Sequence, residues 1–327
     1  MKSLPKTELH LHLEGAAPPR FIQGLAAEKS IDLTGVFDEQ GKYRFSNFAE
    51  FLKVYEAATS VLQTPQDYAR LTQAVLEIQA AHNIVYTETF LSPEFCGGND
   101  LGAWREFLQA IQEAAEQAYR QDGVILRGIV TAIRHLGPDR AKGAALCAAE
   151  TVGDWLVGFG IAGAETVGEP KDFAYSFDMA REAELGLTAH AGEWRGPTDI
   201  KATLQDLRVA RLGHGVRAIE DLSLVDHLAE QRILLEICPG SNIALGVYPR
   251  WEAHPIERLR ERGVRLSIST DDPPFFHTDL STEYDCLADI FGWTEADFAQ
   301  INRDAMDAAF CNQATLDEVL KHFPKDS

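Results

Sequence analysis

The chain has 327 residues, of which 45% are hydrophobic, and it carries a formal net charge of −20. These values are typical of a water-soluble α/β protein with an ample core, built as one large domain or two modest ones. The acidity argues against nucleic acid or an anionic membrane as a partner, although a halophilic habit would give the same charge. No linker or internal repeat divides the sequence, so we expect a single domain over residues 1–327.

The cysteines and the N-terminus predict a cytoplasmic protein. The five cysteines are scattered and form no Cys-x-x-Cys pair, which argues against a disulfide framework. Residues 1–5 lack the apolar region of a signal peptide, and no apolar run is long enough to span a bilayer. These features leave the oligomeric state open.

Short β-rich runs alternate along the chain with longer helical stretches. The expected strands are residues 8–14, 84–90, 124–134, 157–165, 187–193, 211–217, 233–239 and 264–270. Helical periodicity is clearest in residues 64–81, 103–120, 172–184 and 221–231, and residues 31–62 form an inserted, partly helical segment. Eight strands, each followed by helical sequence, predict a (β/α)8 TIM barrel with additional helices. Active sites of this α/β fold lie at the carboxyl ends of the strands.

His10 and His12 alternate with leucines in the first expected strand. Side chains two residues apart on a strand point to the same face, so both imidazoles converge on one spot. Imidazole is the commonest ligand for zinc-like metals. Two ligands do not make a metal site, however, and a pair of histidines on a solvated strand face fits the same pattern.

Other metal-competent side chains follow three later strands. His190 and Glu193 end the fifth expected strand, His214 lies on the sixth, and Asp271 and Asp272 close the eighth. Taken singly, Glu193 fits a solvated loop, His214 a tight packing position, and the Asp pair a helix cap or turn. Taken together they occupy the active-site end of one barrel, where three histidines and an aspartate can hold a metal and leave room for water.

The order of these motifs resembles the adenosine deaminase family of the amidohydrolase barrels, over nearly the whole chain. The matching motifs are His10-Leu11-His12, His190-Ala191-Gly192-Glu193, Gly213-His214-Gly215, Cys238-Pro239-Gly240-Ser241-Asn242 and Thr270-Asp271-Asp272-Pro273. The resemblance implies an enzyme of purine metabolism that hydrolyses adenosine, and 2'-deoxyadenosine, to the inosine product and ammonia. It also implies one zinc ion per chain, held by His10, His12, His190 and Asp271, with His12 contacting the substrate as well.

The same resemblance implies roles for the remaining residues. His214 would orient the attacking water or assist its deprotonation, a task that Asp271 would share. Glu193 would protonate N1 of the purine, which requires a raised pKa. Asp272 would accept a hydrogen bond at N7, and the backbone N–H of Gly163 would meet N3, where the absence of a side chain lets the ring approach.

An aromatic stripe in the inserted segment has two interpretations. Phe48, Phe51, Leu52 and Tyr55 share one helical face, which is typical of an ordinary core-facing helix. The resemblance implies instead an apolar lid that closes the active-site mouth and excludes water, with Phe48 and Phe51 touching substrate. Phe275 and Phe276 would line the same mouth.

Glu14 departs from the adenosine deaminase pattern, in which an aspartate at this position meets the ribose. A glutamate here resembles the adenine deaminases, whose substrate has no ribose. The glycine before His214, and the Pro273-Pro274-Phe275-Phe276 run, resemble the adenosine enzymes instead. Two features against one favour adenosine, with adenine or a larger 6-aminopurine nucleoside as the alternatives.

Two other classes of protein are less consistent with the sequence. A catalytically silent binding protein would be expected to lack a ligand or the proton donor, and every matched position here is intact. A metalloprotease would carry a His-Glu-x-x-His helix, and a phosphatase a pair of metal-bridging groups; neither is present.

Overall fold

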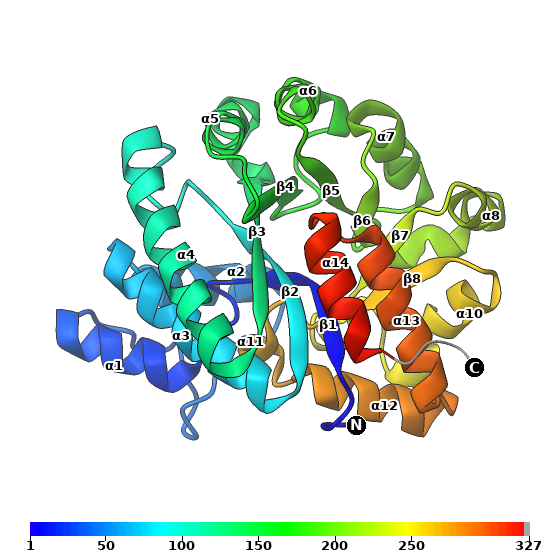
Figure 1. The fold of residues 1–327 in the computed structure, drawn as a ribbon, viewed down its shortest axis with the longest axis horizontal. Helices are drawn as coiled ribbons and strands as arrows, with labels where there is room; N and C mark the ends of the chain where they lie inside the picture. The colour runs from blue at the N-terminus through cyan, green and yellow to red at the C-terminus, as the bar shows by residue number, and fades with distance from the viewer. Residues whose placement is uncertain (324–327) are drawn as a thin grey trace.

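The computed structural model describes residues 1–323. Its eight strands form one parallel sheet in the order β1 to β8, with helices on its outer face (Figure 1). The strands are β1 (Lys6–His12), β2 (Ile84–Leu91), β3 (Ile125–Ile133), β4 (Leu156–Ala162), β5 (Gly186–Ala191), β6 (Arg211–His214), β7 (Leu234–Ile237) and β8 (Arg265–Ile268). The predicted barrel is confirmed.

Seven α-helices lie between β1 and β6, and the first three of them precede β2, where the inserted segment was expected. These helices are α1 (Pro19–Lys29), α2 (Phe48–Thr59), α3 (Pro65–Ala81), α4 (Leu101–Asp122), α5 (Pro138–Ala149), α6 (Ala174–Glu182) and α7 (Pro197–Leu207). Their starts follow local chemistry, as in α3, where the N-cap Thr64 forms a capping box with Asp67 and Pro65 is the first helical residue.

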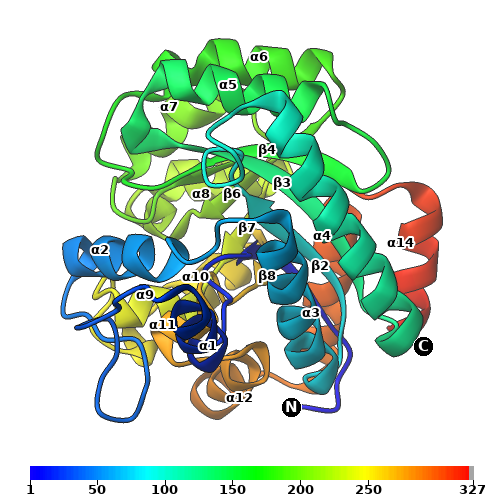
Figure 2. The ribbon, with the colours of Figure 1, turned by 90° about the vertical axis from the view of Figure 1, so that its left-hand side faces the viewer.

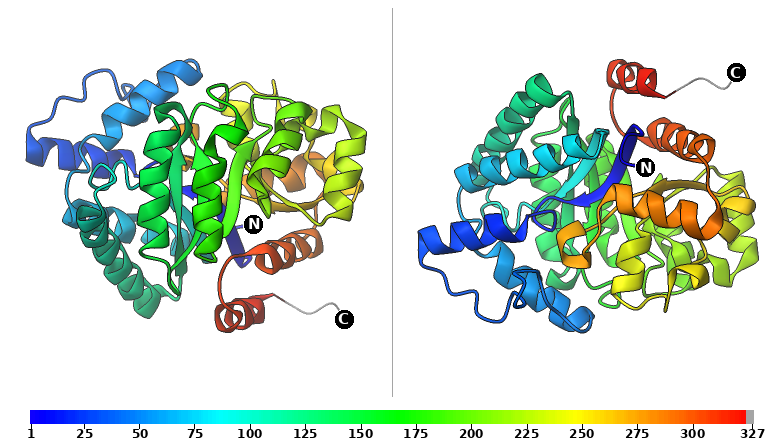
Figure 3. Two further views of the ribbon diagram at one scale, coloured as in Figure 1. Left: turned by 90° about the horizontal axis from the view of Figure 1, so that it is seen from above. Right: turned by 90° about the horizontal axis from the view of Figure 1, so that it is seen from below.

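The second half of the helices follows β6, β7 and β8. They are α8 (Leu222–Glu230), α9 (Pro239–Ala244), α10 (Ile256–Glu261), α11 (Pro273–Phe276), α12 (Leu280–Phe291), α13 (Glu295–Ala308) and α14 (Gln313–Val319). Helix α2 lies at one end of the barrel and α14 at the other, as Figures 2 and 3 show. Among the described residues, no helix combines the length and apolar character needed to cross a bilayer.

Several strands end earlier than the sequence pattern predicts, because the backbone turns at residues with positive φ. β5 ends at Ala191, before Gly192 (φ +83°), and β6 ends at His214, before Gly215 (φ +67°). Such angles are compatible with glycine and not with a continuing strand. Glu193 therefore lies on a loop beyond its strand.

The strands are buried on both faces, as expected for a parallel sheet covered by helices. All seven residues of β4 are buried, for example. The ring is completed between β1 and the segment after β8, where Leu11 and Asp271 form a parallel bridge. Barrel closure thus brings the first and last expected metal ligands together.

Candidate active site

Backbone hydrogen bonds at the barrel closure fix Asp271 between the two histidines of β1. The N–H of His12 donates to the carbonyl of Asp271 at 3.0 Å, and the N–H of Asp271 donates to the carbonyl of His10 at 3.1 Å. Oδ1 of Asp271 consequently lies 3.2 Å from Nε2 of His12 and 3.5 Å from Nε2 of His10. Asp271 has a φ of +66°, a strained conformation that this surrounding backbone enforces.

His190, at the end of β5, completes a cluster whose donor atoms have the spacing of metal ligands. Its Nε2 lies 3.2 Å from Nε2 of His12. Donor atoms of His10, His190, His214 and Asp271 all lie within 4.8 Å of one another, and those of His12, Asp271 and Asp272 form a second such group. Tetrahedral zinc with Zn–N distances of about 2.0–2.1 Å places neighbouring ligand nitrogens about 3.3 Å apart. Nε2 of His10 is buried without a hydrogen-bond partner. The donor set and its spacing therefore fit zinc.

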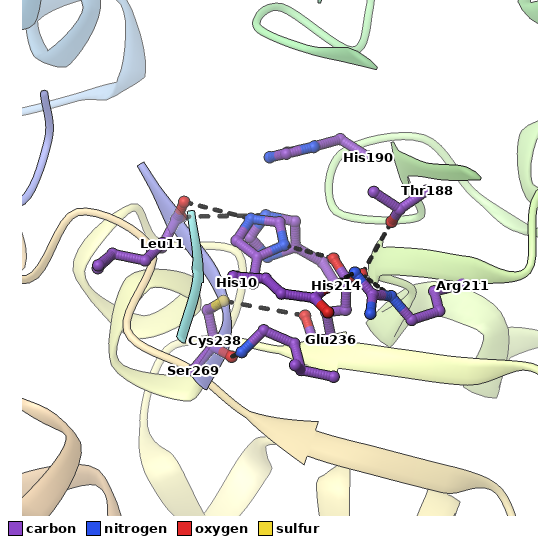
Figure 4. A network of polar contacts seen from close by, with 12 residues as sticks. His10, Leu11, Thr188, His190, Arg211, His214, Glu236, Cys238 and Ser269 are labelled. Carbon is purple, nitrogen blue, oxygen red and sulfur yellow. Dashed lines mark hydrogen bonds and ion pairs between the residues drawn. The ribbon is translucent and has the colours of Figure 1, made fainter. Parts of the chain in front are cut away.

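A buried polar network orients His10 from below (Figure 4). Nδ1 of His10 lies 2.8 Å from Oε2 of Glu236, whose other oxygen accepts from Arg211 Nε at 2.7 Å and Thr188 Oγ1 at 2.9 Å. Arg211 also forms a 2.7 Å ion pair with Glu88. Burial alone would lower the pKa of His10, but Asp271 and Glu236 raise it to about 9. Because Glu236 occupies Nδ1, Nε2 is the nitrogen left for a metal.

Glu193 lies on the loop after β5, and a second glutamate holds that loop. The Glu165 carboxylate accepts hydrogen bonds from the backbone N–H groups of Gly192, Trp194 and Arg195. Glu193 itself is 6% exposed. Burial, reinforced by the charges of Asp271 and Glu165, raises its pKa well above the ordinary value. This direction suits a carboxyl group that donates a proton.

His214 and Asp272 face the same space. Nε2 of His214 lies 3.9 Å from carboxylate oxygens of both Glu193 and Asp271, and burial lowers the pKa of His214 to about 3. Burial and the neighbouring carboxylates, Asp271 first, raise the pKa of Asp272 well above its ordinary value. Both pKa shifts favour the uncharged form of the group concerned.

These groups open into one cavity of about 980 Å³, its mouth included. The α2 residues Phe48, Phe51, Leu52 and Tyr55 line it, as do His12, His190, Glu193, His214, Asp271 and Asp272. The lining contains five carboxylate side chains, with Glu14 and Glu56 as the others, and no lysine or arginine. Such a lining disfavours phosphorylated ligands.

The aromatic face of α2 thus lies over the cavity, as the lid interpretation expects. The expectation that Phe275 and Phe276 line the mouth is wrong: they are buried behind α2. Phe51 packs against both rings, at centroid distances of 5.7 and 5.3 Å. They support the lid through these ring contacts with Phe51 of α2.

Glu14 lies at the cavity wall, 3% exposed. Oε1 accepts a hydrogen bond of 3.0 Å from the hydroxyl of Tyr68 on α3. Burial raises the pKa of Glu14 to about 7. The helix that follows the inserted segment therefore positions a carboxyl group next to the space for a substrate.

Gly163 lines the cavity just after β4, and the structure gives two further reasons for a glycine at this position. Its φ is +95°, and a Cβ there would lie 2.8 Å from Nδ1 of His135. A side chain is excluded by the backbone angle and by His135, a residue that the sequence reasoning did not single out. His135 also accepts the N–H of Ala164 at 3.3 Å.

Sequence reasoning missed the residues that hold the site from behind. Glu236 carried a readable signal, as a charged residue inside the apolar strand β7. Ser241 lies in the Cys238–Asn242 motif, but the motif gave no role for it. Its hydroxyl donates to Asp271 Oδ2 at 2.7 Å. Glu165 gave no local signal, because its partners are backbone groups of a distant loop.

Comparison with known proteins agrees with this arrangement. The family model described as adenosine deaminase matches residues 5–325. A protein of Rhizobium leguminosarum bv. trifolii named adenine deaminase is 44% identical over 317 residues, which cover 97% of this chain and 98% of that protein.

Solved structures show the same fold. The adenine deaminase of Arthrobacter aurescens is 27% identical with a TM-score of 0.89, covering 98% of each chain. An amidohydrolase of Burkholderia ambifaria with bound zinc is 26% identical with a TM-score of 0.86, covering 96% of this chain and 88% of that one. The chain is a hydrolytic deaminase and belongs to the adenosine deaminase family of the amidohydrolase superfamily.

Proposed function

We propose that this protein is an adenine deaminase, which hydrolyses adenine to hypoxanthine and ammonia with one zinc ion per chain. The observation that carries the choice of substrate is Glu14, buried at the cavity wall and held by Tyr68. The similarity to proteins named adenine deaminase supports the same choice. The expectation of adenosine as the main substrate is not confirmed, and the alternative, adenine, fits better.

The chemistry of adenine explains why a carboxylate at Glu14 favours it. Free adenine has an N–H at position 9, which a nucleoside has lost to its glycosidic bond. An ionised Glu14 can accept that hydrogen bond, whereas a nucleoside would leave the buried carboxyl group without this partner. Sites that hydrogen-bond a substrate N–H reject analogues lacking it by about 10⁴-fold or more.

The metal would be held by His10, His12, His190 and Asp271, with Glu236 and Ser241 fixing two of these ligands. A zinc ion there would supply a water molecule activated for attack at neutral pH. Three of these four residues, His12, His190 and Asp271, line the cavity, so an ion held by them would lie at its wall. The bound zinc of the Burkholderia ambifaria protein is consistent with this choice of metal.

The protein groups around the cavity would then act on the purine ring. Glu193, protonated because of its raised pKa, would donate to N1 and make C6 electrophilic. N7 of adenine is a hydrogen-bond acceptor, so Asp272 would donate to it rather than accept. The raised pKa of Asp272 supports this change of role. Gly163 would offer its N–H to N3, and the aromatic face of α2 would exclude water.

Product analysis tests the function directly. We expect purified, zinc-loaded protein to convert adenine to hypoxanthine with one ammonia released per turnover, and Glu193→Gln to lose nearly all of this activity. Formation of no hypoxanthine by correctly folded, zinc-loaded protein would contradict the proposal. The scattered cysteines, all free, are consistent with a reducing cytoplasm as the site of action.

A further inference from the structure

A chain of hydrogen bonds reaches His214 from outside the cavity. The backbone N–H of Ile256 donates to Nδ1 of His254 at 3.2 Å. Nε2 of His254 lies 3.1 Å from Oδ1 of Asn242. Nδ2 of Asn242 lies 3.3 Å from Nδ1 of His214. The three side chains are all buried, so none of these groups can exchange its partner for bulk water.

The direction of donation along this series of hydrogen bonds is fixed at Ile256, because a backbone N–H can only donate. Nδ1 of His254 is therefore an acceptor, and a neutral His254 carries its proton on Nε2. That N–H donates to the amide oxygen of Asn242, which leaves the amide nitrogen to donate to Nδ1 of His214. A neutral His214 then carries its proton on Nε2, the nitrogen that faces Glu193 and Asp271.

Both imidazoles are neutral in this environment. Burial lowers the pKa of His254 to about 3, with the charges of His214 and Arg258 acting in the same direction. The ring of Tyr248 packs against the edge of His254, at a centroid distance of 5.1 Å, and brings no charge. Nδ1 of His214 accepts from Asn242 and so carries no proton, which leaves His214 neutral as well. Each ring therefore has one defined tautomer at neutral pH.

We propose that Asn242 and His254 are positioning residues, which hold His214 as the Nε2–H tautomer so that it donates a hydrogen bond into the cavity. In this form Nε2 has no free lone pair, so His214 orients the attacking water and does not take its proton. The inference deepens the proposed function, on which it rests, by choosing one of two roles for His214.

Nitrogen NMR of the zinc-loaded protein labelled with ¹⁵N-histidine tests the inference, because protonated and unprotonated ring nitrogens have well separated shifts. We expect His214 to show a protonated Nε2 and an unprotonated Nδ1, assigned by loss of the signals in His214→Gln. A proton on Nδ1 of His214 in the unmutated protein would overturn the inference, whatever the variants do.

Asn242→Asp should reverse the direction of the hydrogen bond between residue 242 and Nδ1 of His214. Its carboxylate accepts from His254 and also from Nδ1 of His214, so the proton of His214 moves to Nδ1. The loss of a preorganised donor should lower kcat by about 10²–10³-fold. His254→Gln keeps an acceptor for the N–H of Ile256 and a donor for Asn242, so it should keep the proton of His214 on Nε2. A proton on Nδ1 of His214 in this variant would contradict the inference.

A purely structural role predicts a different pattern. Asn242→Asp would then lower the unfolding temperature while leaving the His214 nitrogen signals unchanged, and this result would overturn the inference. The NMR readout does not depend on turnover. A folded protein without deaminase activity would therefore contradict the proposed function, and the tautomer of His214 would still be measured.

Discussion

The hydroxyl of Tyr68, on a helix that follows the insertion between the first two strands, donates a 3.0 Å hydrogen bond to the carboxyl group of Glu14. Both side chains are buried, at 0% and 3% exposure. The contact orients a carboxyl group that the sequence singled out by its resemblance to the adenine deaminases. It connects α3 to the wall of the cavity.

Substitution of Glu14 tests this relationship. Glu14→Asp withdraws the carboxyl group from Tyr68 and from the position proposed for N9. A hydrogen bond to a charged group contributes about 1.5–3 kcal/mol, so we expect kcat/KM for adenine to fall by about 10- to 100-fold, with a smaller loss or a gain for adenosine. Tyr68→Phe, the control, should lower adenine use less. An unchanged ratio of the two substrates in Glu14→Asp would rule out Glu14 as the specificity residue.

Glu193→Gln removes the proposed proton donor and keeps the shape of the side chain. General acid catalysis contributes about 10²–10⁴-fold, and we expect kcat to fall by that factor. Metal content, measured by mass spectrometry, should stay at that of the unmutated protein, because Glu193 is not a ligand. His12→Ala should lose both metal and activity. A Glu193→Gln enzyme with nearly full kcat would show that N1 is protonated by another group.

Glu236→Gln tests the network beneath His10. An amide cannot replace a carboxylate that contacts His10, Thr188 and Arg211 at once, so the ring is held less firmly. We expect zinc affinity, measured by competition with a chromogenic chelator, to fall by about 10- to 100-fold. Glu283→Gln is the control, because Glu283 is equally buried and its hydrogen-bond partners are Gly240 and Thr278. Equal zinc affinities in the two variants would contradict this role.

The raised pKa of Glu283 should make the stability of the protein depend on pH. Burial raises its pKa to about 8, from 4.5, so the folded protein holds a proton that the unfolded chain releases above pH 4.5. The free energy of unfolding should therefore decrease as pH rises from about 5 to 8. Glu283→Gln lacks this group and should lose less stability over that interval. Denaturant unfolding at both pH values measures the difference, and parallel changes in the two proteins would refute it.

The lid gives a prediction about KM. Phe48 is partly exposed and packs against Trp194, at a centroid distance of 5.1 Å, so its removal should disturb the fold little. Phe48→Ala should raise KM for adenine several-fold, because the apolar wall that excludes water is reduced. Lys53→Ala, on the exposed side of the same helix, is the control. Equal KM values in both variants would assign α2 to packing alone.

The barrel was predictable from local periodicity, and so was the gathering of the reactive side chains at one end of it. His10 and His12 share a strand face, and the other reactive groups follow strand ends that a closed barrel must bring together. The supporting residues were not predictable, because their partners are distant in sequence. Glu165 binds a loop 27 residues away, and Asn242 connects two histidines that only the fold brings together. The contact between Tyr68 and Glu14 was likewise not predictable, because no spacing rule connects the two residues.

The most direct test of the central claim is the ratio of kcat/KM for adenine to kcat/KM for adenosine, measured on the same zinc-loaded preparation with 2'-deoxyadenosine alongside. We expect a ratio of about 10⁴ or more in favour of adenine. Turnover of adenosine or 2'-deoxyadenosine with no detectable use of adenine would contradict it, and would show that Glu14 accommodates a ribose.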